Sequence, residues 1–382
     1  MSYLEYNTQR MPKGMAKVLY MNWPLVVLLI AVACYGFVML YSVAAGNARP
    51  WMEPQMQRFG VGLVVMLVVA MVPIWFWRSV SGLAYGLTTI LLLGVEFFGS
   101  VGMGAQRWLE IGPLRLQPSE LAKITTIMAL AAYFDWVDIK KISRPVFVLG
   151  AAVIVLLPVF LVVRQPDLGT ALLIAAAGGA VIFAAGVHWG YFAGVIGSFV
   201  GLVVAVFTSR GTDWQLLKDY QYRRIDAFLD PTLDPLGAGY HINQAMIALG
   251  SGGWSGRGFM EGTQSRLNFL PEKQTDFIFT TLAEEFGFIG AGSLLVLYVM
   301  ILGFCLVTVL RTSNRFAALL AVGVTANFFL YFAVNTAMVM GLAPVVGVPL
   351  PLVSYGGSAM LVLMGGFGLL QSAHIHRPRL PT

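Results

Sequence analysis

Charged residues are scarce in this 382-residue chain: Asp, Glu, Lys and Arg make up only 11% of it. A soluble domain carries about 25% of these residues, so this chain cannot cover a folded surface with charge. Its hydrophobic share of 58% is too high for a disordered chain. Its basic residues are too sparse to form a nucleic-acid-binding patch. The composition therefore predicts a polytopic membrane protein.

Cysteine and histidine are also rare. The two cysteines, Cys34 and Cys305, both fall in apolar runs, which predicts two buried free thiols and no disulfide. The four histidines fall in segments predicted on opposite sides of the membrane, so they form no metal-binding pattern. The chain has no tandem repeat, Walker loop or HExxH motif. It thus carries no sequence signature of nucleotide-driven or zinc-dependent chemistry.

Apolar sequence is abundant, in runs of about 20 residues, the length that crosses a bilayer as a helix. The first run follows a polar tail and is too long for a cleavable signal, so we expect an uncleaved span. We predict an all-α polytopic membrane protein with ten transmembrane helices. Glycines spaced by four in the seventh run predict close helix packing. The ten ranges are 22–45, 59–77, 80–99, 119–134, 145–163, 168–187, 189–207, 278–309, 316–343 and 357–373.

Basic residues predict the orientation, because Lys and Arg concentrate in cytoplasmic loops. With the N-terminus in the cytoplasm, eleven fall inside: Arg10, Lys13, Lys17, Arg78, Lys140, Lys141, Arg144, Arg311, Arg315, Arg377 and Arg379. Five fall in short outer segments: Arg49, Arg58, Arg107, Arg115 and Arg164. Both termini are therefore predicted to be cytoplasmic. We expect a tail of residues 1–21, a single cytoplasmic-membrane domain of residues 22–373, and a second tail of residues 374–382.

One large extracytoplasmic loop, residues 208–277, is predicted between the seventh and eighth helices. It holds 15 of the 42 charged residues, and a loop this long inside a compact protein is usually functional. Its segment 221–230 mixes Arg223 and Arg224 with apolar residues, which predicts a helix lying on the outer leaflet. The glycine-rich stretch 237–262 predicts a flexible connection.

Ionisable residues at membrane depth are costly and are functional by default. Glu120, Asp167 and Asp276 each lie where an even-numbered predicted helix enters the membrane from outside. Three carboxylates at one depth predict a common cavity open to the outside. Capping is the structural alternative, because the helix dipole stabilises an N-terminal carboxylate by about 0.3–1 kcal/mol. Capping would explain one such acid more readily than three.

Further charged residues complete the predicted site. Glu120 and Lys123 share a helix face as an i, i+3 pair, which fits either a functional site or a buried architectural pair. Asp276, Thr280 and Glu284 share a face if the eighth helix begins near residue 275, whereas Glu285 is expected to be a packing contact. Helix N-termini bind phosphates, so an anionic lipid-linked substrate is predicted. Lipid headgroup contacts are the alternative for each basic residue. The basic residues concerned are Arg107, Lys123, Arg223, Arg224 and Lys273.

Six motifs, in one order over residues 22–376, resemble those of the SEDS family (shape, elongation, division and sporulation proteins). Met338-Val-Met-Gly and His374-Ile-His-Arg are more similar to the elongation-type members than to the division-type members. The six motifs are Gly104-Ala-Gln-Arg-Trp-Leu, Gln117-Pro-Ser-Glu-Leu-Ala-Lys, Gln165-Pro-Asp-Leu-Gly-Thr, Asp234-Pro-Leu-Gly-Ala-Gly-Tyr, Phe269-Leu-Pro-Glu-Lys-Gln-Thr-Asp-Phe-Ile-Phe and Pro344-Val-Val-Gly-Val-Pro-Leu-Pro-Leu-Val-Ser-Tyr-Gly-Gly-Ser.

The resemblance implies a ten-helix peptidoglycan glycosyltransferase that polymerises lipid II onto an undecaprenyl-pyrophosphate-linked glycan during cell elongation. It also implies a class B penicillin-binding protein (a transpeptidase) and other elongation-complex proteins as partners. Asp276 matches the family's essential aspartate, Glu120 and Lys123 its helix pair, and Asp167 its further acid. In an inverting transfer, Asp276 is the expected base, and a divalent cation (Mg²⁺ or Mn²⁺) would help neutralise pyrophosphate. The sequence places no ligands for that cation.

Two other functions use the same features. Intramembrane charges also occur in transporters, so a lipid II flippase is the first alternative. The acids gather at one face of the predicted membrane domain and not at its midplane, which favours the enzyme. The second alternative is a non-catalytic scaffold for the partner transpeptidase.

Overall fold

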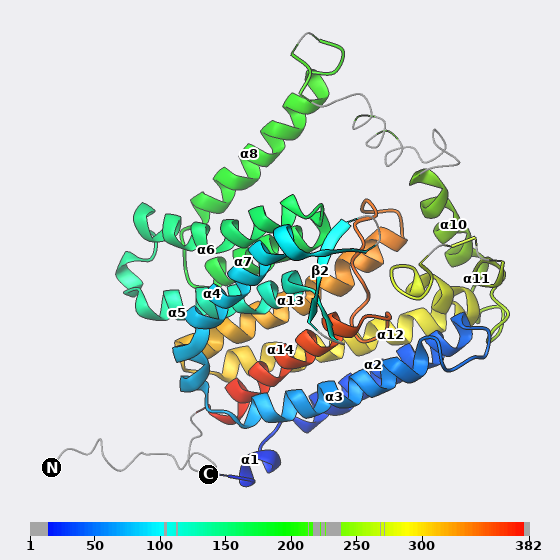
Figure 1. Cartoon of the computed structure of the whole chain (residues 1–382), viewed down its shortest axis with the longest axis horizontal. Coiled ribbons are helices and arrows are strands. Elements are labelled where there is room, and N and C mark those ends of the chain that lie inside the picture. Colours follow the sequence, from blue (N-terminus) through cyan, green and yellow to red (C-terminus); the bar gives the residue numbers. More distant parts are fainter. Residues whose placement is uncertain are drawn as a thin grey trace.

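A computed structural model describes residues 14–377 except 103–104, 112–113, 213, 217–221, 223–225, 227–237, 268 and 271. Ten of its helices coincide with the ten predicted spans (Figure 1). The second helix covers residues 52–71 where 59–77 was predicted, because its first two turns are polar, and the third begins at Ile74 where residue 80 was predicted. The ten are α2 (Trp23–Val43), α3 (Met52–Met71), α4 (Ile74–Phe98), α5 (Pro118–Trp136), α6 (Pro145–Arg164), α7 (Leu168–Ala184), α8 (Trp189–Thr208), α12 (Ile278–Arg311), α13 (Arg315–Val339) and α14 (Gly357–Ile375).

Eight of these ten helices are long and apolar enough to cross a membrane. Helix α7, with 17 residues, is shorter than a typical span. Helix α5 has 19 residues, and the charged side chains of Glu120, Lys123 and Asp135 lower its hydropathy. The polytopic architecture is therefore confirmed, while the transmembrane assignment of α5 and α7 remains a prediction.

The structure is mainly helical, as predicted, with an exception between α4 and α5. Strands β1 (Ser100–Gly102), β2 (Ala105–Ile111) and β3 (Leu114–Leu116) form an antiparallel sheet in the order β1-β2-β3. Residues 109–111 of β2 pair with residues 114–116 of β3, and this register sets Glu110 opposite Arg115. The segment is too short to span a membrane, and hydropathy alone does not reveal backbone pairing. The sheet supports two arginines, Arg107 and Arg115.

The prediction of a flexible connection over 237–262 is also wrong for the residues described. Helix α10 (Ala238–Ser251) is followed by a loop that packs on α12 and leads into α11 (Thr263–Arg266). A Cβ on Gly252 or Gly256 would lie 2.0 Å from a carbonyl oxygen of α12. Helix α12 breaks at Gly287, whose φ is 64°. The glycines therefore permit close backbone approach. Two further short helices are α1 (Ala16–Leu19) and the 3-10 helix η2 (Ile139–Lys141).

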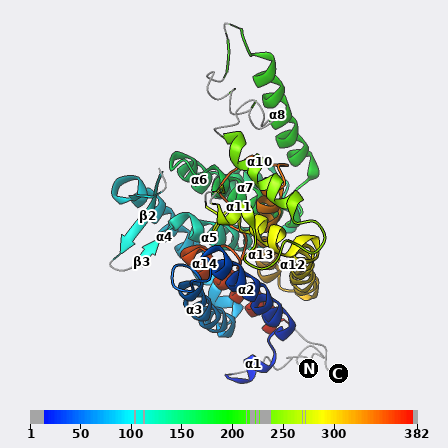
Figure 2. The same ribbon diagram turned by 90° about the vertical axis from the view of Figure 1, so that its right-hand side faces the viewer.

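The start of α2 and the end of α14 lie side by side. The Asn22 backbone N–H donates to Gln371 Oε1 at 2.9 Å, and Gln371 Nε2 donates back to the Asn22 carbonyl at 3.2 Å. Both described ends of the chain therefore lie at the same end of the bundle, as an even number of crossings requires. Helices α5, α7, α12 and α14 begin at the opposite end (Figures 1 and 2).

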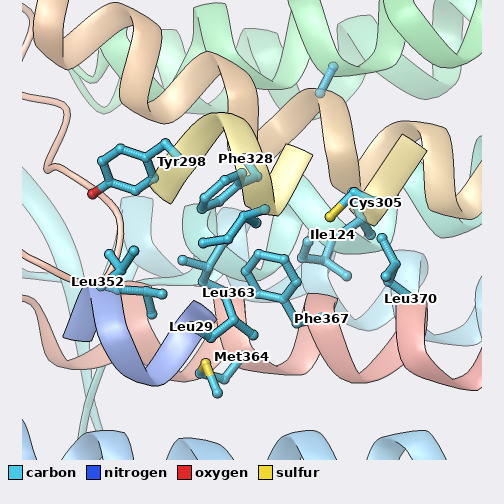
Figure 3. Packing of buried hydrophobic residues seen from close by; sticks show 14 of the residues in the cluster. Leu29, Ile124, Tyr298, Cys305, Phe328, Leu352, Leu363, Met364, Phe367 and Leu370 are labelled. Carbon is cyan, nitrogen blue, oxygen red and sulfur yellow. The ribbon is translucent and has the colours of Figure 1, made fainter. Parts of the chain in front are cut away.

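The core lies between α2, α12, α13 and α14 (Figure 3). The Phe328 ring lies 5.7 Å from the Tyr298 ring and 5.2 Å from the Phe367 ring, centroid to centroid. Cys305 is buried there, whereas Cys34 is exposed, so the prediction of two buried thiols is wrong for Cys34. A polytopic protein directs apolar residues toward lipid as well as toward its core, so an apolar run does not predict burial.

Helix α8 packs differently from the other long helices. None of its residues is buried, and it extends away from the bundle in both views (Figures 1 and 2). A Cβ on Gly194, Gly197 or Gly201 would meet no atom within 4 Å. The predicted glycine-mediated packing is therefore wrong as far as the described residues are concerned. Small residues permit close approach between helices, but they do not supply the second helix.

Candidate functional site

The three predicted acids lie at or just before the N-terminal ends of three helices. Glu120 is the third residue of α5. Asp167 caps α7, where its Oδ1 accepts a hydrogen bond from the Thr170 backbone N–H at 3.3 Å. Asp276 lies in the turn of residues 272–277, because α12 begins at Ile278. The prediction that Asp276 shares a helix face with Thr280 and Glu284 is therefore wrong.

Glu120 and Lys123 form a buried ion pair that includes Tyr331 of α13. Lys123 Nζ lies 2.6 Å from Glu120 Oε1 and also contacts the Tyr331 hydroxyl. That hydroxyl donates to Glu120 Oε2 at 2.8 Å. The Lys123 residue is only 1% exposed. The pair therefore joins α5 to α13 and has its charge compensated internally.

Helix α13, which contacts the Glu120–Lys123 pair, also contacts the Asp276 turn. Asn335 lies one helical turn beyond Tyr331, and its Nδ2 donates to the Asp276 carbonyl at 2.9 Å and to the Val348 carbonyl at 2.8 Å. One face of α13 thus contacts Glu120, the Asp276 turn and the segment that precedes α14. Glu120 and Asp276 are far apart in sequence, but both contact α13, Glu120 through Tyr331 and Asp276 through Asn335.

The Asp276 turn is held by its backbone. Ser354 Oγ donates to the Thr275 carbonyl at 2.5 Å, and the Tyr355 N–H donates to the Gln274 carbonyl at 2.9 Å. Asp276 itself is partly exposed, and its carboxyl group, in contrast to its backbone, has no hydrogen bond or ion pair among the residues described. Partial burial, together with the nearby Glu272 carboxylate, raises the pKa of Asp276 to about 6.

Asp167 lies close to the same segment. It accepts from Gln117 Nε2 at 3.2 Å, and its Oδ1 lies 3.9 Å from Arg107 Nη1. A Cβ on Gly169 would lie 2.4 Å from the Val346 carbonyl oxygen, so α7 begins directly against residues 344–348. Asp167 therefore caps α7, as the capping explanation for the predicted acids expects. It also lies beside residues 344–348, the segment that contacts the Asp276 turn.

The two remaining basic residues of the predicted set are Lys273 and Arg223. Lys273 Nζ donates to the Ser265 carbonyl at 2.7 Å, and partial burial lowers the pKa of Lys273. Arg223, Arg224 and most of the predicted interfacial helix at 221–230 lie outside the described residues. Glu285 accepts from Ser42 Oγ of α2, which confirms its prediction as a packing contact.

A cavity of about 910 Å³ lies between α3, α5 and α14. Its lining is mainly apolar and extends along α3 from Arg58 to Val69, which corresponds to about 16 Å of helix. Arg58 and Arg115 lie at the end where α3, α5 and α14 begin. Sequence reasoning used both arginines only to assign topology. Both arginines lie on the predicted outer side, next to apolar segments, and this position could have marked them as candidate site residues.

Arg58 is available to bind an anion. Its guanidinium lies over the Tyr355 ring, 4.9 Å from the ring centroid, and beside Gly357, the first residue of α14. It makes no hydrogen bond or ion pair with the described part of the chain. Arg115, in contrast, pairs with Glu110 at 2.7 Å. The Tyr355 backbone N–H also donates to the Gln274 carbonyl, so Tyr355 connects Arg58, which lines the cavity, with the Asp276 turn.

Metal-binding groups are sparse across the described ranges, which contain no group of three or more His, Cys, Asp or Glu placed to hold a metal ion. The end of the bundle where α5, α12 and α14 begin thus offers an unpaired carboxyl group, several cationic side chains and a long apolar cavity. Such an arrangement suits a base-assisted reaction on a lipid-linked anion.

Comparisons with known proteins find similar chains along nearly the whole length. A family model described as cell cycle protein, named for FtsW, RodA and SpoVE, matches residues 22–379. Peptidoglycan glycosyltransferase MrdB of Escherichia coli K12 is 42% identical over 358 residues, covering 93% of this chain and 94% of that protein. A chain from a peptidoglycan synthase complex that coordinates polymerization and crosslinking has a TM-score of 0.80 at 30% identity, covering 93% and 97%. Thermus thermophilus rod shape determining protein RodA has a TM-score of 0.70 at 27% identity, covering 94% and 98%.

Proposed function

Because the chain belongs to the FtsW, RodA and SpoVE family of cell cycle proteins, we infer that it is a peptidoglycan glycosyltransferase of the cytoplasmic membrane. Its relatives carry that activity in their names, and similarity extends over nearly the whole chain. The membership confirms the resemblance drawn from its motifs. The substrate, the orientation in the membrane and the roles of individual residues are our proposals.

All ten long helices are proposed to span the membrane, with both termini in the cytoplasm and the loop 208–277 outside. Supporting this, the described ends of the chain meet at one end of the bundle and Asp276 lies at the other. The site then faces the outer surface of the cytoplasmic membrane, in a membrane domain of residues 22–373. Lipid II, delivered to that surface, is the proposed substrate.

Asp276 is the proposed base. Its carboxylate removes the proton from a sugar hydroxyl of lipid II as the hydroxyl oxygen bonds to the anomeric carbon of the growing strand. The bond from that carbon to undecaprenyl pyrophosphate breaks, and the pyrophosphate leaves with the electron pair. The observation that carries this proposal is that Asp276 is partly exposed and that its carboxyl group makes no hydrogen bond or ion pair with the described residues.

The cavity between α3, α5 and α14 is the proposed prenyl groove. Arg58 and the start of α14 would bind the attached phosphates at its mouth, since guanidinium groups and helix N-termini both bind phosphate. Arg107 and Lys273 are proposed to contact phosphate or sugar nearby, and Arg223 is proposed to contact substrate from the loop. Substrate binding by Asp167, Glu120 and Lys123 stays a prediction.

The proposed partner is a class B penicillin-binding protein, which would crosslink the emerging strand. The synthase complex with a similar chain coordinates polymerization with crosslinking, which supports such a partner. Other elongation-complex proteins are proposed to join the same assembly.

The function is tested with the full-length protein in liposomes that contain lipid II, by measuring glycan chains on gels and lipid translocation by a fluorescent headgroup. We expect glycan synthesis without translocation. Translocation without synthesis would establish the flippase alternative. If neither occurs but the partner transpeptidase binds, the scaffold alternative holds.

The rate of polymerisation is expected to depend on the ionisation of Asp276. A base must be deprotonated, so the rate should fall as the pH drops through about 6, the pKa of Asp276, and should be fully present above it. Glu272→Gln removes a neighbouring negative charge, which lowers the pKa of Asp276, so the acidic limb should move to lower pH. Initial rates of polymerisation between pH 4.5 and 8 measure the acidic limb of the wild type and its shift in Glu272→Gln. An acidic limb that does not move in Glu272→Gln contradicts the assignment.

Substrate affinity is expected to depend on the arginines at the cavity mouth. Arg58→Ala should raise the KM for lipid II about tenfold, because a hydrogen bond to a charged group contributes about 1.5–3 kcal/mol. Arg115→Ala should have a smaller effect, since Arg115 is already paired with Glu110. Arg49→Ala is the matched control, because Arg49 is exposed and outside the cavity lining. Equal KM values for Arg58→Ala and Arg49→Ala would remove Arg58 from the site.

A further inference from the structure

Glu284 is a buried acid of α12 that the proposed reaction does not use. It is 0% exposed, and its neighbour Glu285 is 3% exposed. Each has one carboxyl oxygen with a hydrogen bond and one without a partner in the described part of the chain. Burying an acid is costly unless its interactions compensate, so the groups that these two acids bind indicate what each one does.

The two acids bind different parts of the protein. Glu285 accepts from Ser42 Oγ of α2, and it also lies near the Met260 backbone and Arg266 without a hydrogen bond to α11. Glu284 Oε1 instead accepts from the Gln264 backbone N–H at 3.1 Å and from Thr263 Oγ1 at 3.0 Å, both in α11. Glu284 thus fixes the start of the four-residue helix α11, which lies in the loop segment leading to Asp276.

Helix α11 in turn supports the turn that carries Asp276. The Ser265 carbonyl, one residue beyond Gln264, accepts from Lys273 Nζ at 2.7 Å. Lys273 lies three residues before Asp276, in the same turn of residues 272–277. A continuous set of contacts therefore leads from Glu284 through α11 and Lys273 to the proposed base.

The loop before α11 is held against α12 at the same place. The Arg257 N–H donates to the Glu284 carbonyl at 3.0 Å, and the Gly258 N–H donates to the Glu285 carbonyl at 3.1 Å. Arg257 Nη1 also donates to Thr263 Oγ1 at 2.7 Å, which leaves the Thr263 hydroxyl proton for Glu284. The main chain would thus keep the loop near α12 without Glu284, and the side chain would set the position of α11.

We propose that Glu284 is a positioning residue that holds Asp276 in its reactive place by fixing α11 and, through it, Lys273. This rests on the proposed function of Asp276. Glu284 is assigned no contact with substrate. The positioning role requires only an acceptor oxygen at residue 284, so glutamine should replace Glu284 better than alanine does.

Hydrogen–deuterium exchange of the full-length protein in lipid nanodiscs, without substrate, tests the positioning directly. Glu284→Ala should increase exchange in residues 263–277, and Thr263→Val, a milder change at the partner, should increase it less. Glu285→Gln is the matched control: it neutralises the adjacent buried acid but keeps a side chain of the same size beside Gly262, and it leaves the hydrogen bonds from α11 to Glu284 in place, so exchange in residues 263–277 should remain close to the wild-type level. Equal exchange in Glu284→Ala and wild type would overturn the proposal.

Kinetics supply the second test. Glu284→Ala should lower kcat for lipid II polymerisation by about 10²-fold, the cost of a small misplacement of a reacting group, with KM changed less than about twofold. Glu284→Gln should recover most of kcat. Glutamine as inactive as alanine would show that the charge is needed and would overturn the positioning role. If the wild-type protein polymerises nothing, the proposed function fails, while the exchange result still tests whether Glu284 orders the turn.

Discussion

Replacing Asp276 by alanine is expected to slow glycan polymerisation by about 10²–10⁴-fold, the contribution that a general base typically makes. The Asp276 carboxyl group makes no hydrogen bond or ion pair with the described residues, so its loss breaks no contact that holds the fold. The turn is held by its backbone carbonyls, which the substitution leaves in place. The thermal stability of the variant should therefore match that of the wild type.

The measurement is the initial rate of lipid II polymerisation by full-length protein in liposomes, alone and with its transpeptidase partner. Glu53→Gln is the matched control, because Glu53 is an exposed acid in the first turn of α3, at the same end of the bundle. Its rate should equal that of the wild type. Near-normal polymerisation by Asp276→Ala, at normal stability, would remove Asp276 as the base.

Replacing Lys123 by alanine is expected to destabilise the protein by about 3–5 kcal/mol, the usual cost of leaving one member of a buried ion pair uncompensated. Glu120 would remain buried with the Tyr331 hydroxyl as its hydrogen-bond donor. The α5–α13 contact would loosen, and α13 also supplies the Asn335 side chain that binds the Asp276 carbonyl. Thermal unfolding in detergent, followed by near-UV circular dichroism, measures the loss.

The double variant Glu120→Gln/Lys123→Met separates the two explanations for this pair. Removing both charges should restore stability to within about 1 kcal/mol of the wild type, since a neutral buried replacement avoids the unpaired charge. If polymerisation returns along with stability, the pair is architectural. If stability returns and polymerisation does not, the predicted contact with substrate is supported. A double variant as unstable as Lys123→Ala contradicts the charge-compensation argument.

Local sequence was enough to predict much of this protein. Runs of apolar residues marked the ten long helices, because each helix needs about 20 such residues to cross a bilayer. Pro118 and Asp167 marked the starts of α5 and α7, because prolines and capping acids favour those positions. The three predicted acids were therefore placed at helix starts without knowledge of any contact. The family, too, followed from motifs that are contiguous in the chain.

Contacts between distant residues could not be predicted in this way. Tyr331 binds Glu120 across 211 residues, and Asn335 binds Asp276 across 59. Arg58 meets Tyr355 only because α3 packs beside α14. A membrane helix is apolar on its lipid-facing and its protein-facing sides alike, so its sequence gives a weak signal for the face that packs. Neither the cavity nor the position of Arg58 in its lining could be predicted from composition.

Glycine shows the same division between sequence and structure. In residues 250–258 the abundance of glycine predicted flexibility, yet Gly252 and Gly256 pack closely on backbone carbonyls of α12. In α8 its spacing predicted packing, yet a Cβ on Gly194 or Gly197 would meet no atom of another described segment within 4 Å. The sequence by itself determined the membrane class, the helices, the helix-terminal acids and the family, because these depend on neighbours along the chain. Only the tertiary structure decided what each side chain meets, because a glycine permits close approach while the packing of distant helices supplies the partner.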